Sequence, residues 1–408
     1  MLRQVRIVSE QAVVKATKVR ALPNQNSSPR QLLGMSWAHF LNDGSANYLP
    51  GILPAILLSL NEPVSMAGAI MAALMIGQAL QPFFGWVADR VGGKKLIIIG
   101  LFGSSLGGAL LGFAQHNLLF LIGLLLVIGV GNSMFHPQAL AAVRSIVQKR
   151  QGLSLSLFLI GGELGRGVWP TITSWIVVQF GLINLWVTVI PALITLPFLF
   201  KFAPHLPAKR GTTAKIQWSQ HLFPMMGLVG YSSTRSLVVY GLITFIPLLW
   251  HQHGGSLISG ASIITTLLAV GVIGNLSGGH VADRLGRRPV MTLSSIFVTI
   301  LAPFFLFISG AWIWIIAALL GIMLFSSTPV TVLIGQDIFP ENRSMGSGIA
   351  LGLANGIGSM LVFVVGFFVT DKTIESIFWI LAVVSLLSIV FSLIIPKSLM
   401  SHSGGAHH

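Results

Sequence analysis

Four charged residues stand inside long apolar runs of this chain: Asp43, Glu163, Arg166 and Arg235. Glu163 and Arg166 belong to the stretch GGELGRG, and residues at i and i+3 share one face of a helix, so the two side chains can pair. An embedded carboxyl group can also exchange protons, because burial and a neighbouring arginine shift its pKa in opposite directions. The four residues are therefore candidates for proton coupling, with purely structural ion pairing as the open alternative.

Neutral polar side chains accompany these charges in the same apolar segments. Arg235 could also hold an anionic group of a substrate, because a guanidinium forks onto a carboxylate or phosphonate. His136 is expected to form hydrogen bonds at the site, and Trp169 lies about one and a half turns from Glu163. The candidates for substrate binding are His39, Asn42, His136, Gln138, Trp169 and Asn355.

A metal site is the weaker interpretation of the same region. His39, Asp43 and His136 have donor types that bind divalent metals, but they come from distant segments and no ligand-dense motif supports them. We therefore expect no resident metal and no cofactor. The chain has no cysteine, which excludes disulfides and thiolate metal sites. It has no HExxH, GxSxG or Walker-type motif either, so neither an enzyme nor an ATP-driven pump is expected.

The elements that must position these residues are membrane-spanning helices. Of 408 residues, 54% are hydrophobic and 8% are charged, against roughly 25% charged in soluble proteins. A spanning helix needs about 20 mostly apolar residues, and Gly-rich segments without strand-like alternation favour helices over a β-barrel. The sequence predicts an all-α integral membrane protein with twelve spans, at about 31–59, 65–87, 95–114, 117–140, 152–179, 181–201, 220–250, 258–280, 289–309, 311–335, 345–369 and 373–396.

The embedded charges fall near the middle of their predicted spans. Asp43 and Glu163 are each about 12 residues into a helix, which places them roughly 17 Å from the membrane surface at about 1.5 Å per residue. An uncompensated charge at this depth costs at least about 2.5 to 3.5 kcal/mol. Each should therefore face a wet cavity or a partner, and Arg235 is one candidate partner of Asp43.

The distribution of positive residues predicts the orientation. The N-terminal tail and the loops after every second span hold most of the lysines and arginines, whereas the opposite connections hold only Lys372. Since positive loops remain in the cytoplasm, both termini are expected there. This pattern also explains the net charge of +14, and no basic soluble domain is present to favour nucleic-acid binding.

Two copies of one loop pattern lie 194 residues apart, from GWVADRVG at 85–92 to GHVADRLG at 279–286. The repeat predicts two six-helix halves, the construction of alternating-access transporters. The expected divisions are a cytoplasmic tail at 1–30, a bundle at 31–201, a linker at 202–218, a bundle at 219–397 and a tail at 398–408. The residues of the motif are Gly85, Asp89, Arg90 and Gly92 in the first copy and Gly279, Asp283, Arg284 and Gly286 in the second.

The repeated pattern G-x-x-x-D-R-x-G in a twelve-helix chain resembles the signature loop of the major facilitator superfamily. The resemblance implies that this loop latches the two bundles in the outward-facing state. The first copy departs from the family pattern, because Gly93 stands where a cation is usual.

Four further segments resemble the fosmidomycin resistance protein subfamily of proton-coupled drug exporters: HFLND at 39–43, GVGNSMFHPQALAAVR at 129–144, GGELGRGVWP at 161–170 and RSLVVYGLITFIPLL at 235–249. The resemblance implies a monomeric proton-coupled antiporter of the bacterial plasma membrane that exports antibiotics or related amphiphilic or anionic molecules. Two features weaken the expectation of antiport. The helix-4 arginine of many antiporters is absent, and Trp169-Pro170 replaces their Gly-Pro. The alternatives are an uptake symporter or facilitator for a sugar, organic acid or metal ion, and a non-transporting membrane sensor.

Overall fold

The computed structural model describes residues 29–146, 151–204, 218–340 and 343–400, which are helical and contain no strand. The predicted tail at 1–30 lies almost wholly outside these residues, as does most of the predicted linker at 202–218. The elements before the linker are α2 (Pro29–Asn47), α3 (Leu49–Leu60), α4 (Met66–Gln78), α5 (Gln81–Val91), α6 (Gly93–Leu110), η1 (Leu111–Phe113), α7 (Leu118–Ile146), α8 (Gln151–Phe180), η2 (Leu182–Val189) and α9 (Ile190–Phe202).

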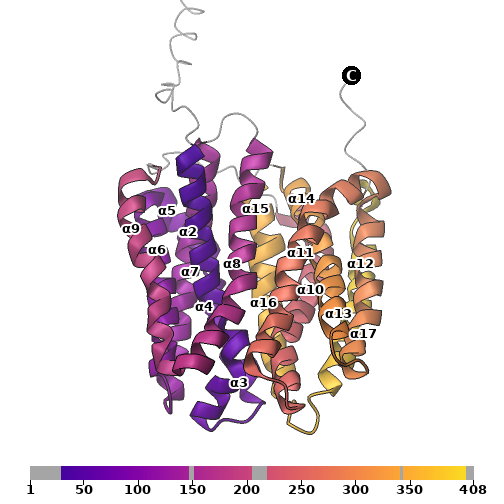
Figure 1. Cartoon of the computed structure of the whole chain (residues 1–408). Helices are drawn as coiled ribbons and strands as arrows, with labels where there is room; N and C mark the ends of the chain where they lie inside the picture. Colours follow the sequence, from indigo (N-terminus) through magenta and orange to yellow (C-terminus); the bar gives the residue numbers. More distant parts are fainter. Residues whose placement is uncertain (1–28, 147–150, 205–217, 341–342, 401–408) are drawn as a thin grey trace, which may run out of the picture.

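The elements after the linker repeat this pattern of long, upright helices beside the first set (Figure 1). They are α10 (Trp218–Gln252), α11 (Leu257–Leu285), α12 (Arg287–Leu301), η3 (Ala302–Leu306), α13 (Trp312–Ser326), α14 (Thr328–Ile338), α15 (Arg343–Gly348), the π-helical η5 (Ile349–Leu353), α16 (Ala354–Gly366), α17 (Ser376–Ile394) and α18 (Lys397–Met400). We call α2–α9 the N-terminal half and α10–α18 the C-terminal half.

Ten segments among the described residues are long and apolar enough to cross a membrane, and they coincide with ten of the twelve predicted spans. The other two windows are occupied by α2 with α3 and by α8. These are the helices that carry Asp43, Glu163 and Arg166, whose polarity lowers the mean hydropathy of their segments. The all-helical membrane architecture is thus confirmed, while the count of twelve rests on including these two polar helices.

The first predicted span is divided rather than continuous. α2 ends at Asn47 and α3 begins at Leu49, with Tyr48 between them. The physical reason is Pro50, which lacks the backbone N–H that would continue the hydrogen-bond ladder. The Tyr48 hydroxyl donates to the carbonyl of Gly108, which attaches this point of the chain to α6.

The two loop motifs form the same turn in both halves. α5 ends at Val91 and α6 begins at Gly93, with Gly92 between them at φ 88° and ψ 151°. Gly286 joins α11 to α12 in the same way, at φ 93° and ψ 155°. This backbone region is essentially restricted to glycine, so the last glycine of each motif has a conformational role.

The charged residues in and after the two motifs make different contacts. The guanidinium of Arg90 lies 3.5 Å from the ring centre of Trp86, and the side chain of Asp89 is outside the described set. After the second copy, Arg287 donates to Asp337 at 2.6 Å and to the carbonyl of Leu399 at 2.8 Å. These bonds attach the described end of the chain to α12 and α14.

The halves contact each other through small residues. The hydroxyls of Thr171 on α8 and Thr265 on α11 lie 2.7 Å apart. Gly167 faces Ala269 one turn further along the same pair of helices, and Gly68 of α4 faces Gly366 of α16. α3 also contacts α10 and α11. Close approach of backbones at small residues is the usual way in which membrane helices pack.

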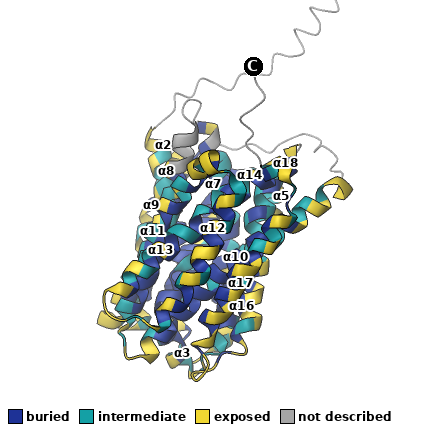
Figure 2. Cartoon of the chain, turned by 90° about the vertical axis from the view of Figure 1, so that its right-hand side faces the viewer, coloured by how far each residue is buried: buried dark blue, intermediate teal, exposed yellow. Residues whose placement is uncertain are grey.

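Buried residues lie toward the centre of the bundle and exposed ones along its outer surface (Figure 2). Many of the exposed side chains are large and apolar, for example Leu119 and Phe368, which are 81% and 75% exposed. An exposed apolar surface of this extent matches the hydrocarbon of a bilayer.

Candidate functional site

Asp43 is the centre of the polar cluster in the N-terminal half. It lies on α2, is 2% exposed, and receives hydrogen bonds on Oδ1 from the side-chain amides of Asn42 and Asn132, both at 3.3 Å. Asn42 is held in turn by the hydroxyl of Ser104, which donates to its amide oxygen at 2.8 Å. The carboxylate is therefore buried but well supplied with donors, as a buried ionised group must be.

Two histidines approach the same carboxylate. The Nε2 atom of His136 on α7 lies 3.0 Å from Asp43 Oδ1, and Nε2 of His39 lies 3.5 Å from Oδ2. The two Nε2 atoms are 3.2 Å apart. The predicted site residues His39, Asn42, Asp43 and His136 thus form one contiguous group, which brings α2 and α7 together.

Arg166 connects this group to Glu163. Its Nη2 atom lies 3.5 Å from Asp43 Oδ2 and 3.5 Å from Glu163 Oε1. The i and i+3 pairing expected from the sequence is present, but the same guanidinium also contacts the second acid. The side chains of Arg166 and Glu163 remain 27% and 16% exposed, whereas Asp43 is enclosed.

The glycines of the GGELGRG stretch allow this arrangement. A side-chain carbon on Gly161 would strike the carbonyl of Ser36, and one on Gly165 would strike the carbonyl of Phe40. α8 therefore lies directly against the backbone of α2, which places Arg166 beside Asp43. These glycines act as packing residues, and the charged side chains project between them.

Arg235 lies apart from the cluster, on α10 of the C-terminal half. Its Nη1 atom donates to the hydroxyl of Thr328 at 3.2 Å. Within the part of the chain that the structure describes, its Nε has no hydrogen-bond partner, although only 7% of the residue is exposed. The suggested pairing of Arg235 with Asp43 is not what the structure shows, because Arg166 and the two histidines occupy that carboxylate. Across the two halves, Glu163 attracts and Arg166 repels the Arg235 guanidinium electrostatically.

The remaining predicted residues are dispersed. Asn355 accepts a hydrogen bond from Ser236 at 2.6 Å, next to Arg235, in the C-terminal half. Gln138 donates to the carbonyl of Phe84 on α5. Trp169 is buried against Gly44 of α2, so it packs inside the N-terminal half.

Sequence reasoning missed the residues that orient the cluster. Asn132 and Ser104 support Asp43 as described above, and the carbonyl of Phe158 holds His39. Asn132 stands four residues before His136, and this helical spacing was the one available signal. The role of a backbone carbonyl such as that of Phe158 leaves no trace in the sequence.

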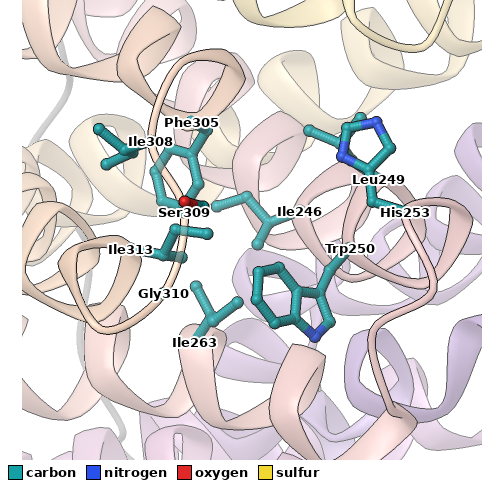
Figure 3. A pocket seen from close by; sticks show the side chains of 10 residues that line it. All are labelled: Ile246, Leu249, Trp250, His253, Ile263, Phe305, Ile308, Ser309, Gly310 and Ile313. Carbon is teal, nitrogen blue, oxygen red and sulfur yellow. The ribbon is translucent and has the colours of Figure 1, made fainter.

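A separate cavity of about 230 Å³ lies near the end of α10, in the C-terminal half. Figure 3 shows Trp250 and Ile246 on one side and the turn at Ser309 and Gly310 on another. The lining is mostly apolar, and none of the predicted site residues belongs to it. It is distinct from the charged cluster.

A comparison of the sequence with models of protein families identifies a family over most of the chain. The model of the Major Facilitator Superfamily matches residues 35–362 and 228–407. The chain belongs to the Major Facilitator Superfamily. It is accordingly a multi-pass membrane transporter, as the repeated loop motif predicts.

Two curated relatives and one solved structure extend this assignment. The chain is 27% identical to the MFS-type transporter YfnC of Bacillus subtilis (strain 168), over 79% of this chain and 82% of that protein. It is 25% identical to the fosmidomycin resistance protein of Escherichia coli (strain K12), over 94% of this chain and 97% of that protein. The fold is similar to that of the nucleoside transporter NupG, with a TM-score of 0.74 and 16% identity over 90% of this chain and 99% of that structure. The predicted resemblance to the superfamily and to the fosmidomycin resistance protein is confirmed.

Proposed function

We propose that this transporter is a proton-coupled antiporter that exports small amphiphilic or anionic molecules, antibiotics among them, by alternating access. The observation that carries the proposal is the position of Arg166, which lies 3.5 Å from the carboxylates of both Glu163 and Asp43. A cation shared between two acids can change partner when one of them is neutralised. Such a change of partner is what a proton-driven cycle requires.

Glu163 is the proton carrier in this proposal. When Glu163 is ionised, Arg166 is shared between the two acids; when Glu163 takes up a proton, Arg166 pairs with Asp43, which remains ionised. Arg166 is followed by Gly167, which faces Ala269 of the C-terminal half. The exchange of partners thus occurs one residue from a contact between the halves, where a small shift can bias their relative position.

The setting of the proposed cycle is the bacterial plasma membrane, with one chain as the working unit and both termini in the cytoplasm. The face at which α2 begins and α18 lies is then the cytoplasmic face, and α3 lies toward the other side (Figures 1 and 2). The partners are protons, a small-molecule substrate and the surrounding lipid. The excess of cations in the loops on one side supports this orientation.

The test is substrate-driven proton movement in proteoliposomes that contain a pH-sensitive dye. Fosmidomycin, a lipophilic drug, a sugar and a divalent metal salt are added one at a time under an imposed pH gradient. We expect one of them to drive protons in the direction opposite to its own movement. Glu163→Gln should remove this proton signal while the protein remains folded, because the glutamine cannot exchange a proton.

The matched control is Glu375→Gln, the same change at a side chain that is 60% exposed. This variant should keep the proton signal of the parent protein. An unchanged ratio of protons to substrate in Glu163→Gln would refute the role of Glu163. Substrate flux without any proton movement in the parent protein would favour a facilitator, and ligand binding without flux would favour a sensor.

A second candidate function, uptake of an organic acid by proton symport, is favoured by Arg235. Its guanidinium is buried with one neutral hydrogen-bond partner and an unsatisfied Nε, a state that a substrate carboxylate would relieve. A bound anion near Glu163 would stabilise the protonated form of that acid, so proton and anion would bind together. The same assay separates the two functions, because symport moves both in one direction.

A further inference from the structure

The two histidines of the cluster have their protons fixed by the backbone. Nδ1 of His39 lies 2.8 Å from the carbonyl oxygen of Phe158, and Nδ1 of His136 lies 3.0 Å from the carbonyl oxygen of Asn132. A carbonyl oxygen only accepts hydrogen bonds, so each Nδ1 must carry the hydrogen. Each neutral imidazole therefore presents a free lone pair at Nε2.

These lone pairs converge on one point with a carboxylate. The Nε2 atoms are 3.2 Å apart, and the carboxylate oxygens of Asp43 lie 3.0 Å from one and 3.5 Å from the other. Three electron-pair donors then face each other with no hydrogen of their own between them. Facing lone pairs repel one another, and a cation held between them would remove this repulsion.

We propose that His39, Asp43 and His136 form a binding site for one divalent transition-metal ion with the ligand preferences of zinc. Zinc binds nitrogen at about 2.0–2.1 Å and carboxylate oxygen at about 2.0–2.2 Å in a tetrahedron, whose ligand atoms are then about 3.3–3.5 Å apart. The two Nε2 atoms are 3.2 Å apart. Asp43 Oδ1 lies 3.0 Å from Nε2 of His136 and Oδ2 lies 3.5 Å from Nε2 of His39, so these separations, made by two oxygens of one carboxylate, bracket this value. Two imidazoles and one carboxylate select zinc, cobalt, nickel or copper over magnesium and calcium.

The two imidazoles have the outer hydrogen bonds of a metal site, while Arg166 also contacts the carboxylate, 3.5 Å from Oδ2. Ligating histidines usually donate their other ring N–H to a backbone carbonyl, which fixes the ring and its tautomer, and both imidazoles do so here. The ligand set occupies three positions of a tetrahedron, and the fourth remains for water or a substrate group, as in zinc sites that bind exogenous ligands. His136 is 25% exposed, which gives an ion a route to the site.

A bound proton satisfies this geometry less completely than a metal ion. It would be shared by His136 and Asp43, the pair at 3.0 Å, and the lone pair of His39 would still face the cluster without a hydrogen. A metal ion contacts all three groups at once. The metal site goes beyond the proposed antiport and does not depend on it, because none of its ligands is the proposed proton carrier.

The test is titration of the full-length protein in detergent with Co²⁺, which absorbs visible light strongly when its coordination is tetrahedral and weakly when it is octahedral. We expect one equivalent of tetrahedral Co²⁺ that Zn²⁺ displaces. His39→Gln and His136→Gln should each abolish the absorption. Each should also weaken Zn²⁺ binding more than the loss of a group that only hydrogen-bonds to a ligand, which costs about 10- to 100-fold.

The matched control is His251→Gln, a change at an exposed histidine of α10 that lies outside the cluster. It should bind as the parent protein does, and the histidines near the C-terminus are common to all variants. Because the two ligand variants lie on different helices, either folded variant is sufficient for the test. Absence of tetrahedral Co²⁺ in the parent protein, or equal binding in a folded ligand variant, would overturn the proposal. Neither result bears on Glu163→Gln, so failure here is distinguishable from failure of the antiport proposal.

Discussion

Arg166 is the residue on which the charge balance of the N-terminal half depends. Its guanidinium contacts two carboxylates at equal distance, and one of them, Asp43, is enclosed by protein. Loss of one member of a buried ion pair is costly because the remaining charge is left without compensation. The arginine is therefore needed for stability as well as for the proposed coupling.

We predict that Arg166→Gln lowers the unfolding temperature in detergent. The free energy of unfolding should fall by at most about 3–5 kcal/mol, the loss found for fully buried pairs. Glu163→Gln in the same chain should restore part of this loss, because it removes one of the two uncompensated acids. Thermal unfolding of the parent, both single variants and the double variant forms the cycle that measures their coupling. Simple additivity of the two effects would show that Arg166 and Glu163 do not interact.

The sequence predicts part of this cluster and leaves the rest open for a physical reason. The pairing of Glu163 with Arg166 follows from helical spacing alone. The approach of His136 to His39 depends on how α7 packs against α2, 97 residues away in the chain. The attachment of Arg166 to Asp43 depends in the same way on the close contact of α8 with α2.

At the scale of elements, the apolar windows predict the helices well because a bilayer requires long apolar segments with satisfied backbones. The same windows missed the division of the first span at Tyr48. The signal was present in Pro50, which cannot supply the backbone N–H of a continuous helix. Apolar length alone does not record such a break.

The loop motifs allow a prediction that distinguishes their two glycines. Gly286 occupies a conformation essentially restricted to glycine, whereas Gly279 is helical and a side-chain carbon there would lie 3.8 Å from Pro329. Gly286→Ala should destabilise the protein by about 1–3 kcal/mol, and Gly279→Ala should be tolerated. Unfolding in detergent measures both, and equal effects would contradict the conformational role of Gly286.

The same prediction applies to the first loop motif. Gly92 has nearly the same backbone angles in the N-terminal half, and Gly85 is the helical counterpart of Gly279. Gly92→Ala and Gly85→Ala should therefore reproduce the difference seen in the second motif. Agreement between the halves would show that the turn geometry, rather than its neighbours, determines the effect.

At the scale of the whole molecule, the halves meet where α8 and α11 lie together. Thr171 and Thr265 contact each other across this boundary, and the chain contains no cysteine that could interfere. Thr171→Cys with Thr265→Cys should therefore form a disulfide on mild oxidation. The bond should stop transport, because alternating access requires the halves to move, and reduction should restore it.

The control for this experiment is Thr171→Cys with Ser277→Cys. Ser277 lies on α11 like Thr265, about three turns further along the helix. This pair should not cross-link, and its transport should not respond to oxidant. A cross-linked Thr171 and Thr265 pair that still transports would show that this contact is retained throughout the cycle.

The break at Tyr48 has a mechanical consequence for the complete transporter. α2 packs mainly on helices of its own half, including α6, α7 and α8, whereas α3 also rests on α10 and α11. A continuous helix that contacted both halves would resist their relative rotation. Because the ladder is already interrupted at Pro50, bending at Tyr48 disrupts fewer backbone hydrogen bonds than bending of an unbroken helix would.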